Sequence, residues 1–190
     1  MWRQPNHPVS ICHNRPMART WLSIDVALVH GRGEDLWPRP GRAFVAARRH
    51  TFADLADAIN TAFSRWDRAH LHEFTLVDGR RIGPLDWADD ADYYITDERK
   101  TTLGCLGLGE QFAFVFDFGD RWEHLCTVGE QRIDPLESLG IVPDSPQPYW
   151  GWGQIPDQYG RRWADDDGES EPPPNPGRTD LPPLRPTWRT

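Results

Sequence analysis

The sequence feature that most restricts the fold is the run QFAFVFDFGDRWEHLCTV, from Gln111 to Val128. Phenylalanine recurs at every second position before the pair Gly119-Asp120, and a period of two is typical of a β-strand with one buried face. A glycine in the first position of a two-residue loop favours a type II′ turn. The run therefore predicts an antiparallel hairpin with strands 111–118 and 122–128.

A two-residue loop also determines which side chains share a face of this hairpin. It places Asp117 opposite Trp122 and Val115 opposite His124, because side chains alternate along both strands. One face then carries Phe112, Phe114, Phe116, Phe118, Leu125 and Thr127, and the other carries Asp117, Trp122, His124 and Cys126. We expect the phenylalanine face to be core and the opposite face to hold a functional site.

Other segments supply the rest of a sheet and one helix. Residues 21–29, 43–47 and 70–77 are predicted strands. Thr51 followed by Asp54 is typical of a helix N-terminus, and the next apolar residues recur at helical spacing, namely Phe52, Leu55, Ile59 and Phe63. The prediction is an α+β fold, an antiparallel β-sheet covered on one face by one main helix, with a Pro/Trp-rich C-terminal extension.

The ends of the sequence differ in composition from its centre. Residues 165–190 combine acidic residues with many prolines and few apolar residues, so they bury too little surface to offset the entropy of ordering. We expect an N-terminal arm over 1–19, an α+β domain over 20–164 and a disordered Pro-rich tail over 165–190.

Composition also excludes several classes of protein. The sequence has no apolar run long enough to span a membrane and no secretory signal. Its three cysteines form neither a disulfide scaffold nor a zinc motif, and we expect a cytoplasmic protein with no membrane partner. The net charge of −8, without a basic block, disfavours generic DNA binding.

Histidines and acidic residues suggest a metal site as one possibility. Residues 70 and 72 point to the same side of a strand, and the following four side chains could converge as ligands of a divalent ion: His70, His72, His124 and Asp117. Asp120 or Glu73 would then be the general base. The alternative is structural, since a half-buried histidine often donates to a carboxylate or a carbonyl.

The stretch 149–163 concentrates aromatic residues among glycines. Exposed, it could stack on a base or a sugar; buried, it would close one edge of the sheet. Its candidate binding residues are Trp150, Trp152, Tyr159 and Arg161. Lys100 is the one lysine of the sequence, and a specific role for its ammonium group is a further possibility.

Three ordered motifs, WDRAHLHEF at 66–74, DERKTTLGCLGL at 97–108 and FAFVFDFGDRWEH at 112–124, resemble the plasmid pRiA4b ORF-3-like family. The resemblance covers roughly residues 21–132, with Phe116 where the family usually has tyrosine. It implies an α+β fold and an association with mobile genetic elements, and it implies no established activity. The sequence shows neither the serine nor the tyrosine constellation of a recombinase.

Two functions follow from these observations. The first is a cytoplasmic binding module without chemistry of its own, which holds a protein, a peptide or a nucleic acid end on the face with Asp117, Trp122 and His124. The second is a metal-dependent hydrolase or nuclease. The cofactor is accordingly none, or a divalent metal.

Overall fold

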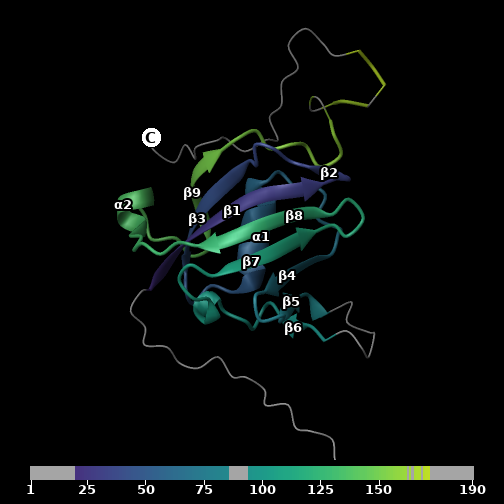
Figure 1. Cartoon of the computed structure of the whole chain (residues 1–190). Coiled ribbons are helices and arrows are strands. Elements are labelled where there is room, and N and C mark those ends of the chain that lie inside the picture. Colours follow the sequence, from purple (N-terminus) through teal and green to yellow (C-terminus); the bar gives the residue numbers. More distant parts are fainter. Residues whose placement is uncertain (1–19, 86–93, 162, 164, 168, 172–190) are drawn as a thin grey trace, which may run out of the picture.

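The computed structural model describes residues 20–85, 94–161, 163, 165–167 and 169–171 (Figure 1). The predicted arm at 1–19 and most of the predicted tail at 165–190 lie outside the described residues. The strands are β1 (Trp21–Gly31), β2 (Glu34–Asp35), β3 (Gly41–Ala47), β4 (His72–Leu76), β5 (Arg81–Gly83), β6 (Thr96–Asp97), β7 (Gln111–Phe116), β8 (Trp122–Val128) and β9 (Gln147–Trp152). The helical elements are α1 (Phe52–Ala62), the 3₁₀ turn η2 (Leu103–Cys105) and α2 (Pro135–Leu139).

All nine strands belong to one sheet, in the order β6-β5-β4-β7-β8-β1-β3-β9, and β2 pairs with β1. Neighbouring strands are antiparallel except β5 and β6, which are parallel. The predicted mixture of sheet and helix is confirmed, but the sheet is mixed rather than wholly antiparallel. None of the helices among the described residues has the length and apolar content that a membrane span needs.

Helix α1 covers one face of the sheet (Figure 1). Thr51 begins it with the predicted capping box: its side chain accepts from the backbone N–H of Asp54, and the Asp54 carboxylate accepts from the backbone N–H of Thr51. The predicted apolar stripe of the helix is buried against phenylalanines of the sheet, with the rings of Phe52 and Phe74 5.0 Å apart. The core therefore lies between α1 and the central strands.

The predicted register of the hairpin is wrong by one residue. Phe116 pairs with Trp122 and Phe114 with His124, so the phenylalanines share their face with Trp122, His124 and Cys126. The loop holds five residues rather than two, because Asp117 adopts a left-handed conformation (φ 58°) and ends the strand. Trp122 and His124 therefore lie in the core beneath α1, and the predicted polar face does not exist.

The predicted aromatic segment begins with the edge strand β9. Trp150 lies opposite Ala43 of β3. The ring of Trp152 packs over Gly41, where a Cβ would overlap the indole, and its Nε1–H donates to the carbonyl of Arg39 at 2.9 Å. The first half of the segment thus closes one edge of the sheet, as the packing alternative predicted.

Candidate functional site

Three connecting segments meet at one end of the sheet, which we call the loop end. They are residues 65–71 between α1 and β4, residues 117–121 between β7 and β8, and residues 156–161 after β9. The backbone N–H of Asp117 donates to the carbonyl of Leu71 at 2.8 Å, which joins the first two segments. Side chains join the third segment to the first.

A chain of polar side chains crosses the three segments. The Tyr159 hydroxyl donates to Asp67 Oδ2 at 2.7 Å, and its oxygen lies 2.8 Å from His70 Nε2. The other ring nitrogen of His70 lies 3.4 Å from Asp117 Oδ2. Burial and the bond to Asp67 raise the pKa of Tyr159 to about 12, and the Tyr159 hydroxyl lowers the pKa of Asp67. At neutral pH the phenol is thus neutral and the carboxylate ionised.

Gln158 fastens residues 156–161 to the segment before β4. Its fully buried side-chain amide accepts from the backbone N–H of Asp67 and donates to the carbonyl of the same residue, both at 3.0 Å. The amide offers one acceptor and one donor to the N–H and C=O of a single residue, as a neighbouring β-strand does. The two segments, more than ninety residues apart in sequence, form one surface.

Trp66 contributes an aromatic wall to this surface. Its Nε1–H donates to Asp157 Oδ2 at 3.3 Å, and the Arg161 guanidinium lies 4.3 Å from its ring centroid. Arg161 also donates to the same Asp157 oxygen through Nε and Nη2, at 3.1 and 2.9 Å. Burial pushes the pKa of Asp157 upward, but the hydrogen bonds from Arg161 hold it below its ordinary value.

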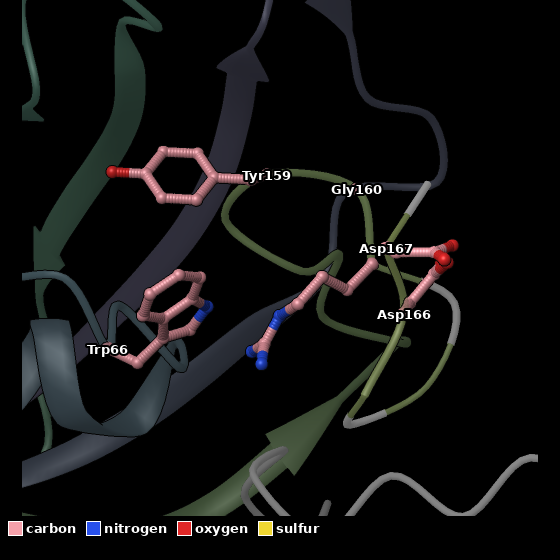
Figure 2. A pocket seen from close by; sticks show the side chains of 6 residues that line it. Trp66, Tyr159, Gly160, Asp166 and Asp167 are labelled. Atoms are coloured by element: carbon pink, nitrogen blue, oxygen red, sulfur yellow. The ribbon is translucent and has the colours of Figure 1, made fainter. Parts of the chain in front are cut away.

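A hollow of about 320 Å³ lies beside this wall, lined by Trp66, Tyr159, Gly160, Arg161, Asp166 and Asp167. Figure 2 shows the two aromatic rings on one side and the carboxylates of Asp166 and Asp167 on the other. Hydrogen bonds led by that of the Ser170 hydroxyl lower the pKa of Asp167 to about 2. Trp66 and Tyr159 remain 45% and 38% exposed, so an external group can reach both rings.

Arg65 lies directly behind this surface and is only 1% exposed. Its Cζ lies 3.7 Å from the centroid of the Trp122 ring, and Nη1 donates to the carbonyl of Pro156 at 3.3 Å. Burial lowers the pKa of Arg65 to about 9, while Asp157 and Asp120 act in the opposite direction. The guanidinium therefore remains charged at neutral pH inside the protein.

Several buried polar atoms around Arg65 have no hydrogen-bond partner within the described part of the chain. They are Nε and Nη2 of Arg65, Nε1 of Trp122 and Nε2 of His124. Buried polar atoms are ordinarily paired, and each unpaired one costs about 1–3 kcal/mol. Within the described residues, three donors (Arg65 Nε and Nη2, and Trp122 Nε1) and one acceptor (His124 Nε2) are thus buried without a partner.

Unusual backbone geometry gathers at the same end. Four non-glycine residues of the described chain have left-handed backbone with φ of 54° to 58°, namely Arg32, Ser64, Asp117 and Arg121. Ser64 directly precedes Arg65. Asp117 and Arg121 begin and end the 117–121 loop. The backbone N–H of Arg32 donates to the carbonyl of Asp120, which lies in the same loop. Such conformations cost free energy and gather at functional sites.

The four predicted metal ligands do not form one cluster. His70 contacts Asp117, whereas His72 donates to Glu98 Oε2 at 2.7 Å. His124 is buried in the core, where its Nδ1–H donates to the carbonyl of Phe114 at 3.3 Å. Across the described ranges, no group of three or more histidine, cysteine, aspartate or glutamate side chains is placed to hold a metal ion.

The remaining predicted residues are dispersed. Glu73, a predicted general base, accepts from Arg81 Nε at 2.8 Å. The carboxylate of Asp120, the other predicted base, lies near enough to Arg65 to influence its pKa. The Lys100 side chain is 83% exposed and contacts Asp97 at 3.3 Å.

Sequence reasoning found some residues of the loop end and missed others. It named Tyr159, Arg161, His70 and Asp117 and expected His70 to lie near Asp117, which the structure bears out, but it did not predict the contact of Tyr159 with His70. Arg65, Asp67, Asp157 and Gln158 were missed, because each acts through a contact between distant loops. The sequence signal that was available is the clustering of aromatic and charged residues in both segments, from Arg65 to His70 and from Asp157 to Arg161.

Comparison with known proteins shows which family the chain belongs to and which solved fold it resembles. No curated protein matches the chain. A solved structure of a protein of unknown function from Methanosarcina mazei Go1 is similar at 20% identity and a TM-score of 0.51, covering 71% of this chain and 70% of its own. At that identity the likeness concerns the fold alone.

The profile of the plasmid pRiA4b ORF-3-like proteins matches residues 32–142. The match includes residues 65–71 and 117–121 of the loop end and stops before residues 156–161. It spans more than half of the chain and agrees with the three motifs read in the sequence. The chain therefore belongs to the plasmid pRiA4b ORF-3-like family.

Proposed function

We propose that this protein is a binding module without chemistry of its own, and that it holds a positively charged polypeptide segment at the loop end. The observation that carries the proposal is a single hollow lined by two part-exposed aromatic rings, Trp66 and Tyr159, and by two carboxylates, Asp166 and Asp167. Aromatic faces and carboxylates both attract ammonium and guanidinium groups. The binding surface is thus the loop end, instead of the polar sheet face expected from the sequence.

The loop end already holds one guanidinium. Arg161 stacks on Trp66 while it donates to Asp157. This arrangement shows that the indole accepts a planar cation, with a carboxylate in reach of its N–H groups. The hollow offers a lysine or arginine of a partner the same combination of an aromatic ring and a carboxylate, namely Tyr159 and Asp167.

Charge favours a cationic partner over a nucleic acid. Hydrogen bonds hold the pKa values of Asp67, Asp157 and Asp167 below their ordinary range, so these carboxylates are ionised at neutral pH. The whole chain carries a net charge of −8. A negative field raises the association rate of cations and repels phosphates.

The polar groups of the site are arranged to hold rather than to react. The Tyr159 hydroxyl is engaged by Asp67 and His70, and its pKa of about 12 keeps it protonated. The second ring nitrogen of His70 faces Asp117. A phenol that stays protonated and side chains held by such contacts orient a partner, which supports binding without turnover.

Fluorescence anisotropy tests the proposal with two labelled peptides, one of alternating glycine and arginine and one of alternating glycine and glutamate. We expect the arginine peptide alone to bind, with an affinity that falls as sodium chloride rises. The double variant Asp166→Asn/Asp167→Asn should bind it about three- to tenfold more weakly, as expected for two part-exposed charges.

A matched control removes two exposed carboxylates near α2, at the opposite end of the sheet (Figure 1), with Glu137→Gln/Asp144→Asn. The control should bind the arginine peptide as the natural protein does. Equal loss in both double variants would show that only net charge matters. Equal binding of the glutamate peptide would contradict the proposal.

A further inference from the structure

Residues 156–161 form neither helix nor strand, and we call them the strap. The strap lies across the segment 65–70, and most of the contacts between them are side-chain bonds. Gln158 pairs with the backbone of Asp67, and Tyr159 reaches Asp67 and His70. The strap thus binds to residues 65–70 as a separate peptide would.

The fit between the strap and this groove is incomplete. Of the Arg65 donors, Nη1 reaches the strap, at the carbonyl of Pro156, while Nε and Nη2 have no partner among the described residues. Asp157 lies close enough to affect the pKa of Arg65, but its carboxylate accepts from Arg161 and Trp66 instead. A ligand with a better-placed acceptor would therefore gain hydrogen bonds that the strap does not make.

We propose that the strap is an intramolecular occupant of a peptide-binding groove, and that the partner is a polypeptide segment that displaces it. The groove consists of Arg65, Trp66, the backbone of Asp67, His70 and the Trp122 ring behind them. This inference shares with the proposed function the premise that the loop end is a binding surface. It goes beyond that function, because the hollow is lined partly by strap residues, and displacing the strap would expose a second binding mode.

The strap contacts specify the chemistry of that partner. A carboxamide pairs with both backbone groups of Asp67, and the next residue places a phenol between Asp67 and His70. Two residues further on, a guanidinium stacks on Trp66. The partner thus carries the order amide, phenol, glycine, arginine, preceded by a carboxylate or carbonyl that reaches the buried Arg65. Glycine is required at the third position because Gly160 has φ 81° and a Cβ there would overlap the Arg32 guanidinium.

The test supplies the strap as a separate peptide. A labelled peptide of residues 154–161, QIPDQYGR, is titrated against the natural full chain and against the full-chain variant Gln158→Ala/Tyr159→Ala. In the natural chain the tethered strap competes at a high effective concentration. We expect the peptide to bind the variant about tenfold or more tightly than the natural chain.

A matched peptide with alanine at both of those positions should bind neither protein. If the double variant does not fold, as judged by circular dichroism, Tyr159→Phe keeps the ring and loses only the hydroxyl contacts to Asp67 and His70. The Tyr159→Phe variant should also bind the strap peptide more tightly than the natural chain does, by a smaller factor than the double variant. Equal binding of the strap peptide to natural and variant chains would overturn the inference.

The glycine-arginine peptide, measured on the same proteins, separates this inference from the proposed function. If that peptide binds the hollow while the strap peptide binds neither protein, the strap inference fails and the proposed function stands. If the strap peptide binds the variant and the glycine-arginine peptide binds nothing, the preference for positive charge fails and the groove stands.

Discussion

His124 provides a direct test of the observed hairpin register through the pH dependence of stability. The side chain is 1% exposed, and burial, assisted by the Arg65 charge, lowers its pKa from 6.5 to about 3. Below pH 6.5 His124 binds a proton in the unfolded chain but not in the folded chain. The free energy of unfolding therefore falls as the pH drops toward 3. At pH 5 the deficit is about 2 kcal/mol, from ~1.4 kcal/mol for each pH step below 6.5.

The variant His124→Phe removes this titration and fits a site bordered by the rings of Phe63 and Phe114, at 4.7 and 5.4 Å. Urea unfolding at pH 7.5 and pH 5.0 measures the effect. The natural protein should lose about 2 kcal/mol more than the variant between the two values. His30→Gln, at a part-exposed histidine paired with Asp35, serves as control. Equal losses in natural protein and variant would refute the buried position of His124.

Three further outcomes follow from the packing. Gln158→Ala should lower the free energy of unfolding by about 1–3 kcal/mol in urea titrations, because it removes a fully buried side chain and leaves two part-buried backbone groups of Asp67 without their partner. Gly31→Ala should lower the melting temperature in calorimetry, since the new Cβ would overlap the Trp122 ring. Burial raises the pKa of Cys126, so at pH 8 its thiol should react with a disulfide reagent only after denaturation.

Local patterns in the sequence were sufficient to predict most of the fold. Short-range patterns identified β1, β4, β7 and β8, the short apolar run at 43–47 identified β3, and the capping box identified the start of α1, because these signals arise between near neighbours. The parallel pair β5 and β6 could not be predicted, since it consists of very short strands joined through a long connection.

The register error has a physical cause that could have been seen in the sequence. Gly119-Asp120 suggested a two-residue loop, but Asp117 tolerates the left-handed region, and its carboxylate accepts from the N–H groups of Gly119 and Asp120. The apolar content of strand 122–128 also favoured the register in which Trp122 and His124 share a face with the phenylalanines. The face with Trp122, Cys126 and Val128 is more apolar than the face with Glu123, Leu125 and Thr127, so the first face belongs in the core.

The site was only partly predictable because its contacts join loops. Tyr159 and Arg161 were identifiable as aromatic and cationic residues in a glycine-rich stretch. Their partners Asp67 and Trp66 lie more than ninety residues away, and no periodic pattern links two irregular segments. Arg65 follows the helix as an ordinary polar residue, and only the tertiary packing over Trp122 shows that it is buried.

An NMR titration of the natural protein with the glycine-arginine peptide tests most directly where a partner binds. We predict chemical-shift changes at the Trp66 indole N–H and at the amides of Tyr159, Gly160 and Arg161, which border the hollow. Changes confined to the sheet face turned away from α1, for example around Thr127, would contradict the assignment of binding to the loop end.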